Sequence, residues 1–278
     1  MMNLKNRNVL ISGGTSGIGL AFAKMAASKG ANLAVFSVDP EPMRDKALEE
    51  IRQAMASSSQ KAIAFELDVS NRDLVSEKLT SAMDEIGDPY VLINSAGMGG
   101  AVPFEEMPYE RFDATVRINL YGTYHCILAA LPRMKQGGGY ICNVSSMSGL
   151  IGLFGYTAYA SSKFALVGFS ESLRAEMKKY DIMVSCLCPP QVDTPLLKKT
   201  DPTKPPETKA LNNNAGLLTA EYVAKVTLED MTKGRFLIVP GFRGKFFHLF
   251  SKTFPGVREI LTDRVIRKVQ QSRKATTA

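Results

Sequence analysis

Tyr159 and Lys163 are the two side chains of this sequence whose types and spacing suggest proton-transfer chemistry. They lie four residues apart, so on a helix both project from the same face. Free tyrosine titrates near ~10 and free lysine near ~10.4, so neither exchanges protons readily at neutral pH. An ammonium beside the phenol would lower the tyrosine pKa. The pair is therefore predicted to exchange a proton with a substrate oxygen, and an exposed helix pair without function is the alternative.

A glycine-rich segment near the N-terminus suggests a phosphate site. It lies between an apolar run at residues 8–12 and a helical pattern at residues 20–29. Glycines at such a junction permit a tight turn, and the backbone N–H groups of the helix N-terminus can then contact a pyrophosphate. No Gly-Lys-Ser/Thr triplet follows, which excludes a P-loop ATPase. The residues predicted to bind a dinucleotide here are Gly13, Thr15, Ser16, Gly17, Ile18 and Gly19.

The elements that must position these residues alternate between strand and helix patterns. Apolar runs predict strands, and stretches with helical spacing separate them. The predicted strands cover residues 8–12, 32–37, 62–67, 90–94, 140–145 and 182–187, and the predicted helices cover 20–29, 42–56, 71–86, 109–136 and 156–180. This alternation predicts an α/β fold, a single doubly wound Rossmann domain over residues 1–242. We expect a parallel sheet of about seven strands with helices on both faces.

Two segments depart from this alternation. Residues 195–216 contain four prolines and three consecutive asparagines, which predicts a long substrate loop, with a variable surface loop as the alternative. Residues 243–278 carry nine Lys/Arg and two Asp/Glu, so this basic C-terminal extension accounts for the whole net charge of +7. Because the rest of the chain is electrically balanced, we expect no nucleic-acid partner.

The C-terminal extension also has an amphipathic pattern. Val257, Leu261, Val265 and Val269 recur every four residues, and several phenylalanines precede them. A basic amphipathic helix beside aromatic residues can lie in a membrane interface. A helix packed on its own domain or on a partner subunit explains the pattern equally well.

Composition narrows the remaining classes of protein. Hydrophobic residues make up 45% and charged residues 22%, which is typical of globular proteins. No apolar run reaches the ~18 residues of a membrane-spanning helix, and the N-terminus lacks the apolar stretch of a signal peptide. The four cysteines include no CxxC pair, which argues against a zinc site or a disulfide framework. We therefore expect a cytoplasmic protein without a metal site.

Several motifs occur in an order that resembles the short-chain dehydrogenase/reductase family over residues 5–240. The glycines have that family's G-x-x-x-G-x-G spacing, Ser145-Ser146 and Gly149 fit its Ser-Ser-x-x-Gly pattern, and Tyr-x-x-x-Lys follows. The resemblance implies an NAD(P)-dependent enzyme that interconverts a carbonyl and an alcohol. It also implies a catalytic tetrad of Asn119, Ser146, Tyr159 and Lys163.

The same resemblance assigns roles to further residues. Ser146 would hold the substrate oxygen and Tyr159 would protonate it. Lys163 would bind the ribose hydroxyls of the cofactor and lower the Tyr159 pKa, and Asn119 would anchor a water molecule. The cofactor contacts implied in addition to the glycine-rich loop, Tyr159 and Lys163 are Ser37, Asp39, Asp68, Val69, Asn94, Ala96, Gly97, Pro189, Val192 and Thr194.

The residues after the second predicted strand leave NAD and NADP open. An acidic residue there binds the ribose 2′-hydroxyl of NAD, and an arginine binds the 2′-phosphate of NADP. Ser37 and Val38 occupy the two usual positions, so neither pattern is met. Asp39 favours NADH, whereas Ser37 with Arg44 would accommodate a phosphate. Resemblance to one branch of the family favours NADPH.

That branch is the 3-ketodihydrosphingosine reductases, which residues 146–163 and the Pro189-Pro190 segment resemble. It implies reduction of a long-chain 3-keto lipid. A 3-oxoacyl thioester and a hydroxysteroid are alternative substrates, and a cofactor-binding regulator and a membrane-surface scaffold are alternatives of other classes. We also expect a homodimer or homotetramer through the two long helices, and peripheral membrane contact through residues 243–278. The residues expected either to line an apolar substrate pocket or, equally well, to pack in the core are Met98, Phe154, Tyr156 and Leu196.

Overall fold

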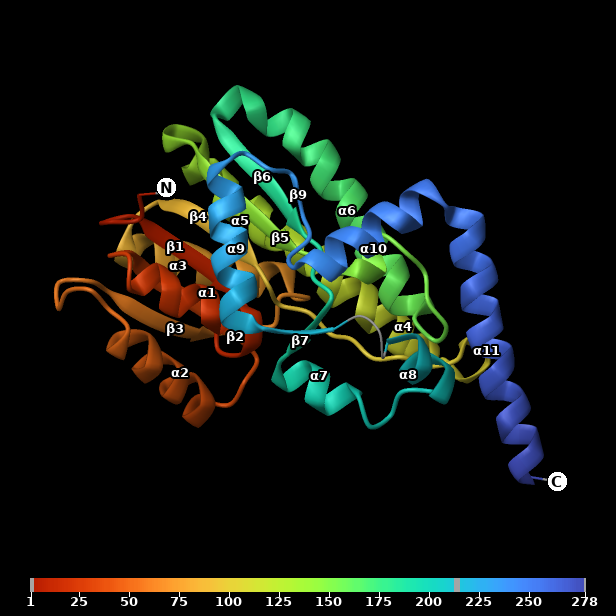
Figure 1. The fold of residues 1–278 in the computed structure, drawn as a ribbon. Coiled ribbons are helices and arrows are strands. Elements are labelled where there is room, and N and C mark those ends of the chain that lie inside the picture. Colours follow the sequence, from red (N-terminus) through yellow and green to blue (C-terminus); the bar gives the residue numbers. More distant parts are fainter. Residues whose placement is uncertain (1–2, 213–215, 278) are drawn as a thin grey trace.

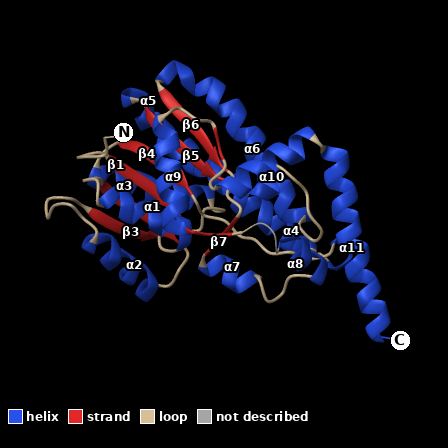
Figure 2. Cartoon of the chain, in the orientation of Figure 1, coloured by secondary structure: helices blue, strands red, loops and turns tan. Residues whose placement is uncertain are grey.

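A seven-stranded parallel sheet forms the centre of the molecule (Figures 1 and 2), as seen in a computed structural model that describes residues 3–212 and 216–277. Its strand order is β3-β2-β1-β4-β5-β6-β9. The strands are β1 (Asn8–Ser12), β2 (Asn32–Ser37), β3 (Ala62–Glu66), β4 (Pro89–Asn94), β5 (Gly139–Val144), β6 (Ile182–Leu187) and β9 (Leu237–Ile238). The predicted doubly wound α/β fold is therefore confirmed.

The strand order places a topological switch at β1. Leu10 pairs with Ala34 of β2 on one side and with Leu92 of β4 on the other. The chain moves outward through β2 and β3, and then returns to continue from β4 in the opposite direction. In open parallel sheets, a crevice forms at the carboxyl ends of the strands where the order reverses, and ligands bind there.

Helices cover both faces of the sheet (Figure 1). On one face α1 (Gly17–Ala27), α2 (Glu41–Gln53) and α9 (Ala220–Thr232) share an apolar core with the strands. On the other face α3 (Arg72–Ile86), α5 (Gly122–Gly137) and α6 (Thr157–Met177) share a second core. Because the sheet is covered on both faces, its strands are mainly apolar rather than alternating regularly with polar residues.

The segment after β6 contains more regular structure than the sequence suggested. It forms β7 (Gln191–Asp193), α7 (Pro195–Thr200) and α8 (Pro206–Asn212), and β8 (Leu217–Thr219) then pairs with β7. The expected long loop over residues 195–216 is thus mostly helical, and its residues 213–215 lie outside the described residues. Thr194 caps α7 by accepting a hydrogen bond from the Leu197 N–H at 3.3 Å. Proline is compatible with the first turn of a helix, where its missing N–H is not needed.

The C-terminal extension forms two helices. α10 (Phe242–Thr253) is followed by α11 (Pro255–Thr277), which packs against both α10 and α8 (Figure 1). Pro255 ends α10, since a proline disfavours helical conformation in the residue before it. No helix within the described ranges is both long and apolar enough to cross a membrane.

Candidate active site

A large cavity lies at the carboxyl ends of the strands, beside the topological switch. Its volume is about 670 Å³, and its lining includes the glycine-rich loop, the ends of the central strands and α6. Sixteen predicted site residues line it, namely Gly13, Ser16, Gly17, Ile18, Ser37, Asp39, Asp68, Val69, Ala96, Gly97, Ser146, Tyr159, Lys163, Pro189, Val192 and Thr194. The structure therefore brings most of the predicted residues together. Thr15, Gly19, Asn94 and Asn119 lie behind this lining.

The glycine-rich loop has the geometry of a pyrophosphate cradle. Gly13 and Gly17 adopt positive φ angles of 67° and 52°, which glycine tolerates better than other residues. A Cβ at Gly19 would collide with the Gly13 carbonyl oxygen, so this close turn requires glycine. The N-terminus of α1 then opens into the cavity at Ser16 and Ile18. Backbone N–H groups at a helix N-terminus favour anions, so this loop fits a dinucleotide.

The end of β2 carries a hydrogen-bonded cluster at the cavity wall. The Thr15 hydroxyl donates to the Asp39 carboxylate at 2.6 Å, and the Asp39 N–H donates to the Ser37 hydroxyl at 3.0 Å. Arg44 donates to the Asp39 carbonyl oxygen and lies 3.2 Å from the Glu66 carboxylate. Thr15 therefore orients Asp39 rather than facing the cavity, and Arg44 is held close to the Asp39 backbone.

The predicted residues at the end of β4 divide between the cavity wall and the sheet. Ala96 and Gly97 line the cavity, whereas Asn94 is buried within the sheet and donates to the Asn143 side chain at 2.8 Å. The Asn94 side-chain oxygen is buried and has no hydrogen-bond partner within the described part of the chain. Asn94 thus contributes to the wall through its backbone position in β4.

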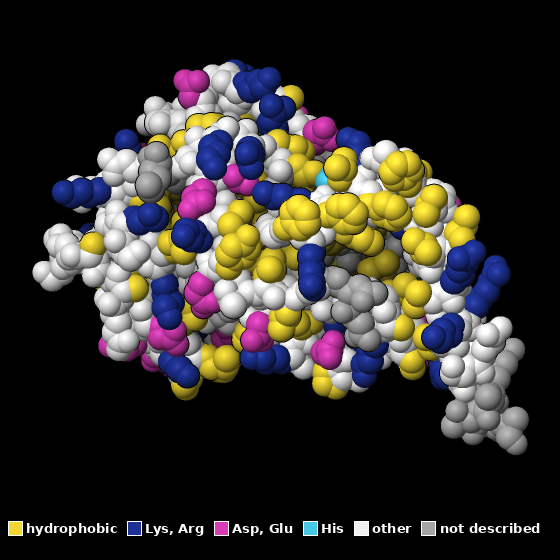
Figure 3. Space-filling view, viewed as in Figure 1, with side chains coloured by type: hydrophobic (Ala, Val, Ile, Leu, Met, Phe, Trp, Pro, Cys, Tyr) yellow, Lys and Arg dark blue, Asp and Glu magenta, His cyan; other side chains and the backbone are white. Residues whose placement is uncertain are grey.

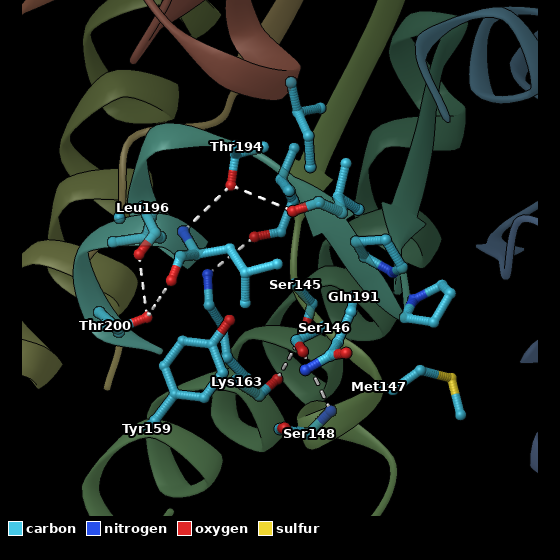
Figure 4. Close-up of a pocket in the computed structure, with 18 of the residues that line it drawn as sticks. Ser145, Ser146, Met147, Ser148, Tyr159, Lys163, Gln191, Thr194, Leu196 and Thr200 are labelled. Carbon is cyan, nitrogen blue, oxygen red and sulfur yellow. Dashed lines mark hydrogen bonds between the residues drawn. The ribbon is translucent and has the colours of Figure 1, made fainter. Parts of the chain in front are cut away.

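Three of the four tetrad residues meet at the centre of the cavity. Figure 4 shows the Tyr159 and Lys163 side chains rising from α6, with Ser146 across from the phenol. The Lys163 Nζ lies 5.8 Å from the centre of the Tyr159 ring, and it donates to the Val144 carbonyl oxygen at 2.9 Å. Ser146 lies just after β5, and its hydroxyl accepts the Ser148 N–H at 3.1 Å. The helical spacing of Tyr159 and Lys163 thus delivers both groups to one place.

Asn119 lies directly behind these groups. It belongs to a π-helical turn, Arg117–Tyr121, between α4 (Tyr109–Val116) and α5. Its side chain accepts the Met98 N–H at 2.8 Å, and donates to the Met98 carbonyl and to the Ser162 hydroxyl. Asn119 is fully buried, so in this arrangement it fixes the loop after β4 against α6.

Burial is the main cause of the pKa shifts of Tyr159 and Lys163. Desolvation raises the pKa of Tyr159 to about 12, although a hydrogen bond with Ser146 acts in the opposite direction. Desolvation also lowers the pKa of Lys163 to about 8. The expected lowering of the Tyr159 pKa is therefore wrong for the chain alone. The reason is that the Lys163 ammonium is bonded to the Val144 carbonyl and lies under the ring, while the phenol loses water.

The segment after β6 closes the cavity over the glycine-rich loop. A Cβ at Gly17 would lie 3.0 Å from the Thr194 Cγ2, so Thr194 packs against that loop. The Pro189 carbonyl accepts the Met147 N–H at 3.0 Å, which ties this segment to the turn after Ser146. Pro190, which replaces a glycine of the resembled family, lies against α10 near Gly244. The proline ring therefore lies against the C-terminal extension at the position where another residue would have its backbone N–H.

The substrate side of the cavity confirms part of the predicted apolar lining. Met98, Tyr156 and Leu196 line the cavity. Phe154 does not, because its backbone turns toward α8, where its carbonyl accepts the Thr208 hydroxyl at 2.8 Å. Lining residues that the sequence did not single out include Gln191, Lys204, Leu211, Arg243, Phe247, Phe250 and Arg258. Leu261 and Val265 of the extension also line the cavity. Their four-residue spacing was the one sequence pattern that indicated an apolar helix face in the extension.

The chemistry of the lining favours an organic cofactor and substrate. Among residues 3–212 and 216–277, no group of three or more His, Cys, Asp or Glu side chains could hold a metal ion. Of the residues described around the cavity, only Asp39 and Asp68 are acidic, and both lie at the end near β2 and β3. The substrate end instead has the cations Lys204, Arg243 and Arg258 among apolar side chains.

Comparison with known proteins agrees with this geometry. A family model described as short chain dehydrogenase matches residues 7–205. A 3-dehydrosphinganine reductase of Danio rerio is 34% identical over 237 residues, which cover 84% of this chain and 71% of that protein. A D-beta-hydroxybutyrate dehydrogenase of Cupriavidus necator is 31% identical, covering 84% of this chain and 86% of that protein.

Solved structures show the same architecture. A short chain dehydrogenase/reductase from Burkholderia phymatum, in complex with NAD, superposes with a TM-score of 0.81 over 93% of this chain and 97% of that chain, at 24% identity. A levodione reductase superposes with a TM-score of 0.76 over 85% of this chain and 96% of that chain, at 25% identity.

Proposed function

This chain belongs to the short-chain dehydrogenase family and is an NAD(P)-dependent oxidoreductase, and we propose that it reduces the 3-keto group of a long-chain lipid such as 3-ketodihydrosphingosine. One observation carries this substrate class. The cavity that Ser146 and Tyr159 line is also lined by the apolar side chains of Leu211, Phe250 and Val265. A small polar ketone would leave that apolar surface in contact with water, whereas an alkyl chain would cover it.

The roles of the tetrad follow from its geometry. When bound, the nicotinamide supplies the hydride. Ser146 holds the carbonyl oxygen of the substrate, and the Tyr159 phenol donates a proton to that oxygen. Lys163 holds the ribose hydroxyls and places a positive charge beneath the phenol. Asn119 anchors a water molecule that connects Lys163 with solvent, and it also maintains the loop through Met98.

The remaining cofactor contacts are proposed along the same wall. The glycine-rich loop binds the pyrophosphate, and Asp68 and Val69 border the adenine. Ala96, Gly97 and Asn94, through its backbone, border the ribose. Pro189, Val192 and Thr194 border the nicotinamide. We propose NADPH as the preferred form, because Arg44 lies beside Asp39 and could turn from Glu66 to a 2′-phosphate.

A second candidate substrate is a 3-oxoacyl thioester. Lys204, Arg243 and Arg258 line the substrate end of the described cavity, with Lys204 in an ion pair with Asp201 and Arg258 in an ion pair with Glu259. This cationic lining suits a phosphate-bearing carrier better than an ammonium group. A relative named 3-oxoacyl-[acyl-carrier-protein] reductase FabG, from Chlamydia trachomatis, is 31% identical over 76% of this chain.

The test is an absorbance assay at the reduced-nicotinamide band. The substrates are 3-ketodihydrosphingosine in mild detergent and a 3-oxoacyl thioester of equal chain length, each run with NADPH and with NADH. We expect oxidation of NADPH that requires the sphingoid ketone. Turnover of the thioester alone would replace the proposed substrate by the second candidate. Binding of cofactor without turnover of either compound would contradict both and favour a regulator.

We further propose that α10 contacts a membrane surface. Phe242, Phe246 and Phe254 are 83%, 62% and 53% exposed, and with Phe250 their rings follow one another at 5.9–6.5 Å along the helix. Figure 3 shows hydrophobic side chains gathered over α10 and the start of α11, with Lys and Arg around them. Exposed aromatic rings beside cations suit the interface of an anionic bilayer.

Self-association is proposed through α4, α5 and α6. The apolar or aromatic side chains exposed on these helices and the turn between them include Tyr109, Tyr121, Tyr124, Leu128 and Phe164. Such a patch is expected to be covered by a second copy of the chain. In this arrangement residues 1–242 form the catalytic domain, and residues 243–278 form an extension that leaves the α4–α6 face free.

A further inference from the structure

The C-terminal extension supplies one wall of the cavity. Phe247 and Phe250 of α10 and Leu261 and Val265 of α11 line the same cavity as Tyr159. These residues lie about 90–105 positions after Tyr159 in the chain. The side chains of Phe250 and Val265 are half-buried, whereas those of Phe247 and Leu261 are 41% and 47% exposed. The extension is therefore part of the binding site rather than an appendage beside it.

Contacts between α8 and α11 hold this wall in place. The two helices pack against each other, and α10 packs against α11. The buried Glu207 carboxylate of α8 lies 3.6 Å from the Arg273 guanidinium of α11. On its other side α8 reaches the catalytic helix, because the Asn212 side chain donates to the Tyr156 hydroxyl at 3.3 Å. A continuous set of contacts thus joins α11 to α6.

We propose that α8, α10 and α11 form a channel that binds the alkyl chain of the substrate and selects for its length. This inference rests on the proposed function and deepens it. With a ketone at Ser146 and Tyr159, the alkyl chain is expected to lie among the lining side chains of Leu211, Phe250 and Val265. Arg243 and Arg258 lie at the same end, so their cations border water or a headgroup while the methylenes stay among apolar side chains.

The proposed channel predicts how substrate binding depends on the length of the alkyl chain. Each methylene removed from water improves binding by about fourfold, as long as the channel extends far enough to cover it. The specificity constant kcat/KM is therefore expected to rise with chain length and then to level off where the channel ends. A charge placed in the channel wall should cancel the gain for long chains and leave short chains unaffected.

Val265→Asp is the variant that tests this, and Ile260→Asp is its matched control. Both changes put a carboxylate on α11, but Ile260 is 55% exposed and does not line the cavity. Analogues of 3-ketodihydrosphingosine with eight, twelve and eighteen carbons are assayed with NADPH. We expect Val265→Asp to lower kcat/KM for the longest analogue by about tenfold or more, and for the shortest by less than about threefold. Ile260→Asp should match the wild type.

A binding measurement tests the channel without turnover. The polyene fatty acid cis-parinaric acid fluoresces when its chain enters an apolar site, and this chain has no tryptophan to interfere. Wild type and Ile260→Asp should bind the probe, and Val265→Asp should bind it about tenfold more weakly. Leu261→Gln, at a more exposed lining position, provides a second variant if Val265→Asp does not fold, as judged by circular dichroism.

The outcomes separate the two proposals. Equal probe binding and equal chain-length profiles in wild type and both lining variants would overturn the channel, even if the sphingoid ketone is reduced. Probe binding that depends on Val265, with no turnover of any 3-keto sphingoid, would support the channel and contradict the proposed substrate. Probe binding that Ile260→Asp weakens as much as Val265→Asp would also overturn the channel.

Discussion

The ionisation of Tyr159 bears on the direction of the reaction. With its pKa raised to about 12 by desolvation, the phenol stays protonated throughout the neutral range. A protonated phenol can donate to a carbonyl oxygen without further activation, which suits reduction. Alcohol oxidation requires the phenolate, which is scarce at neutral pH when the pKa is raised. The protonated Tyr159 is thus suited to donate the proton that carbonyl reduction requires.

Replacement of the phenol tests its role directly. Tyr159→Phe should lower kcat for carbonyl reduction by about 10²–10⁴-fold, because the proton donor is removed. Cofactor affinity, measured by calorimetric titration with NADPH, should remain within about threefold of the wild type, since the ring and its packing persist. Loss of cofactor binding together with turnover would assign Tyr159 a structural role instead.

The pH dependence follows from the same pKa. The rate of reduction should stay nearly constant across the neutral range, because the phenol remains protonated well below about 12. The rate of alcohol oxidation should instead rise with pH, as more phenolate forms. Initial rates in both directions over a series of buffers provide the measurement. A reduction rate that falls steeply with rising pH while still below about pH 8, where Lys163 keeps its charge, would contradict a tyrosine acid with a raised pKa.

The lowered pKa of Lys163 predicts how the free energy of unfolding changes with pH. Its pKa falls from 10.5 in the unfolded chain to about 8 in the fold, because of desolvation. Below about 8 the lysine is charged in both states, so the cost of burying the charge is fully present. Between about 8 and 10.5 the unfolded state binds more protons, so stability rises with pH. Thermal melts should therefore show Lys163→Met most stabilised relative to wild type near neutral pH, with the difference shrinking as pH rises. A constant difference would contradict a lowered pKa.

At the scale of elements, the stripe of Phe242, Phe246 and Phe250 on α10 borders the cavity at one position and is exposed at others. Phe250 and Val265 turn toward the cavity, whereas Phe242 and Phe246 remain exposed. The sequence left open whether the extension binds a membrane or packs on its own domain. The structure shows that packing on α8 occurs, and the exposed aromatic face is still available for a membrane. The two alternatives are therefore compatible.

The membrane-binding face of α10 can be tested without removing the helix. Phe242→Ser combined with Phe246→Ser should abolish co-sedimentation with vesicles of phosphatidylcholine and phosphatidylserine, because the exposed rings can no longer insert. Phe104→Ser combined with Tyr222→Ser removes two exposed rings outside both the extension and the α4–α6 patch, and should leave sedimentation unchanged. Raised salt should weaken binding of the wild type. Equal sedimentation of both double variants would refute the contact.

At the scale of the whole molecule, α10 borders the cavity, whereas the exposed apolar side chains of α4, α5 and α6 lie outside its lining. The cavity is placed by the sheet order, since the chain leaves the carboxyl ends of the neighbouring strands β1 and β4 in opposite directions. The exposed side chains of α5 and α6 lie on the helices that carry the turn with Asn119 and the Tyr159–Lys163 pair. Association through these helices would therefore help to hold the catalytic residues in position from the side away from the cavity.

Light scattering coupled to gel filtration tests this association. We expect a dimer or tetramer for the wild type, and a smaller species for Leu128→Arg, because a charge would be buried in the interface. Met43→Arg, at a half-exposed position of α2 away from this face, should leave the mass unchanged. A wild-type monomer, or an assembly that Leu128→Arg leaves intact, would contradict the proposed interface.

Sequence patterns sufficed wherever the relevant physics is local. The apolar runs of the strands, the glycines at positions 13, 17 and 19, and the spacing of Tyr159 and Lys163 depend on neighbours a few residues away. For that reason the doubly wound fold and the cavity-lining position of Ser146, Tyr159 and Lys163 could be predicted. Helices α7 and α8 were missed because asparagines and prolines are common in loops, although proline also suits a first helical turn.

Tertiary packing decided the features that depend on distant partners. The Tyr159 pKa was predicted with the wrong sign, because burial of the phenol and the bond from Lys163 to Val144 exist only in the folded chain. The short strand β9 is recognisable through its pairing with β6, and Leu261 and Val265 become cavity residues only because α11 packs against α8. An amphipathic pattern predicts that a helix has an apolar face. It does not predict which other part of the fold covers that face.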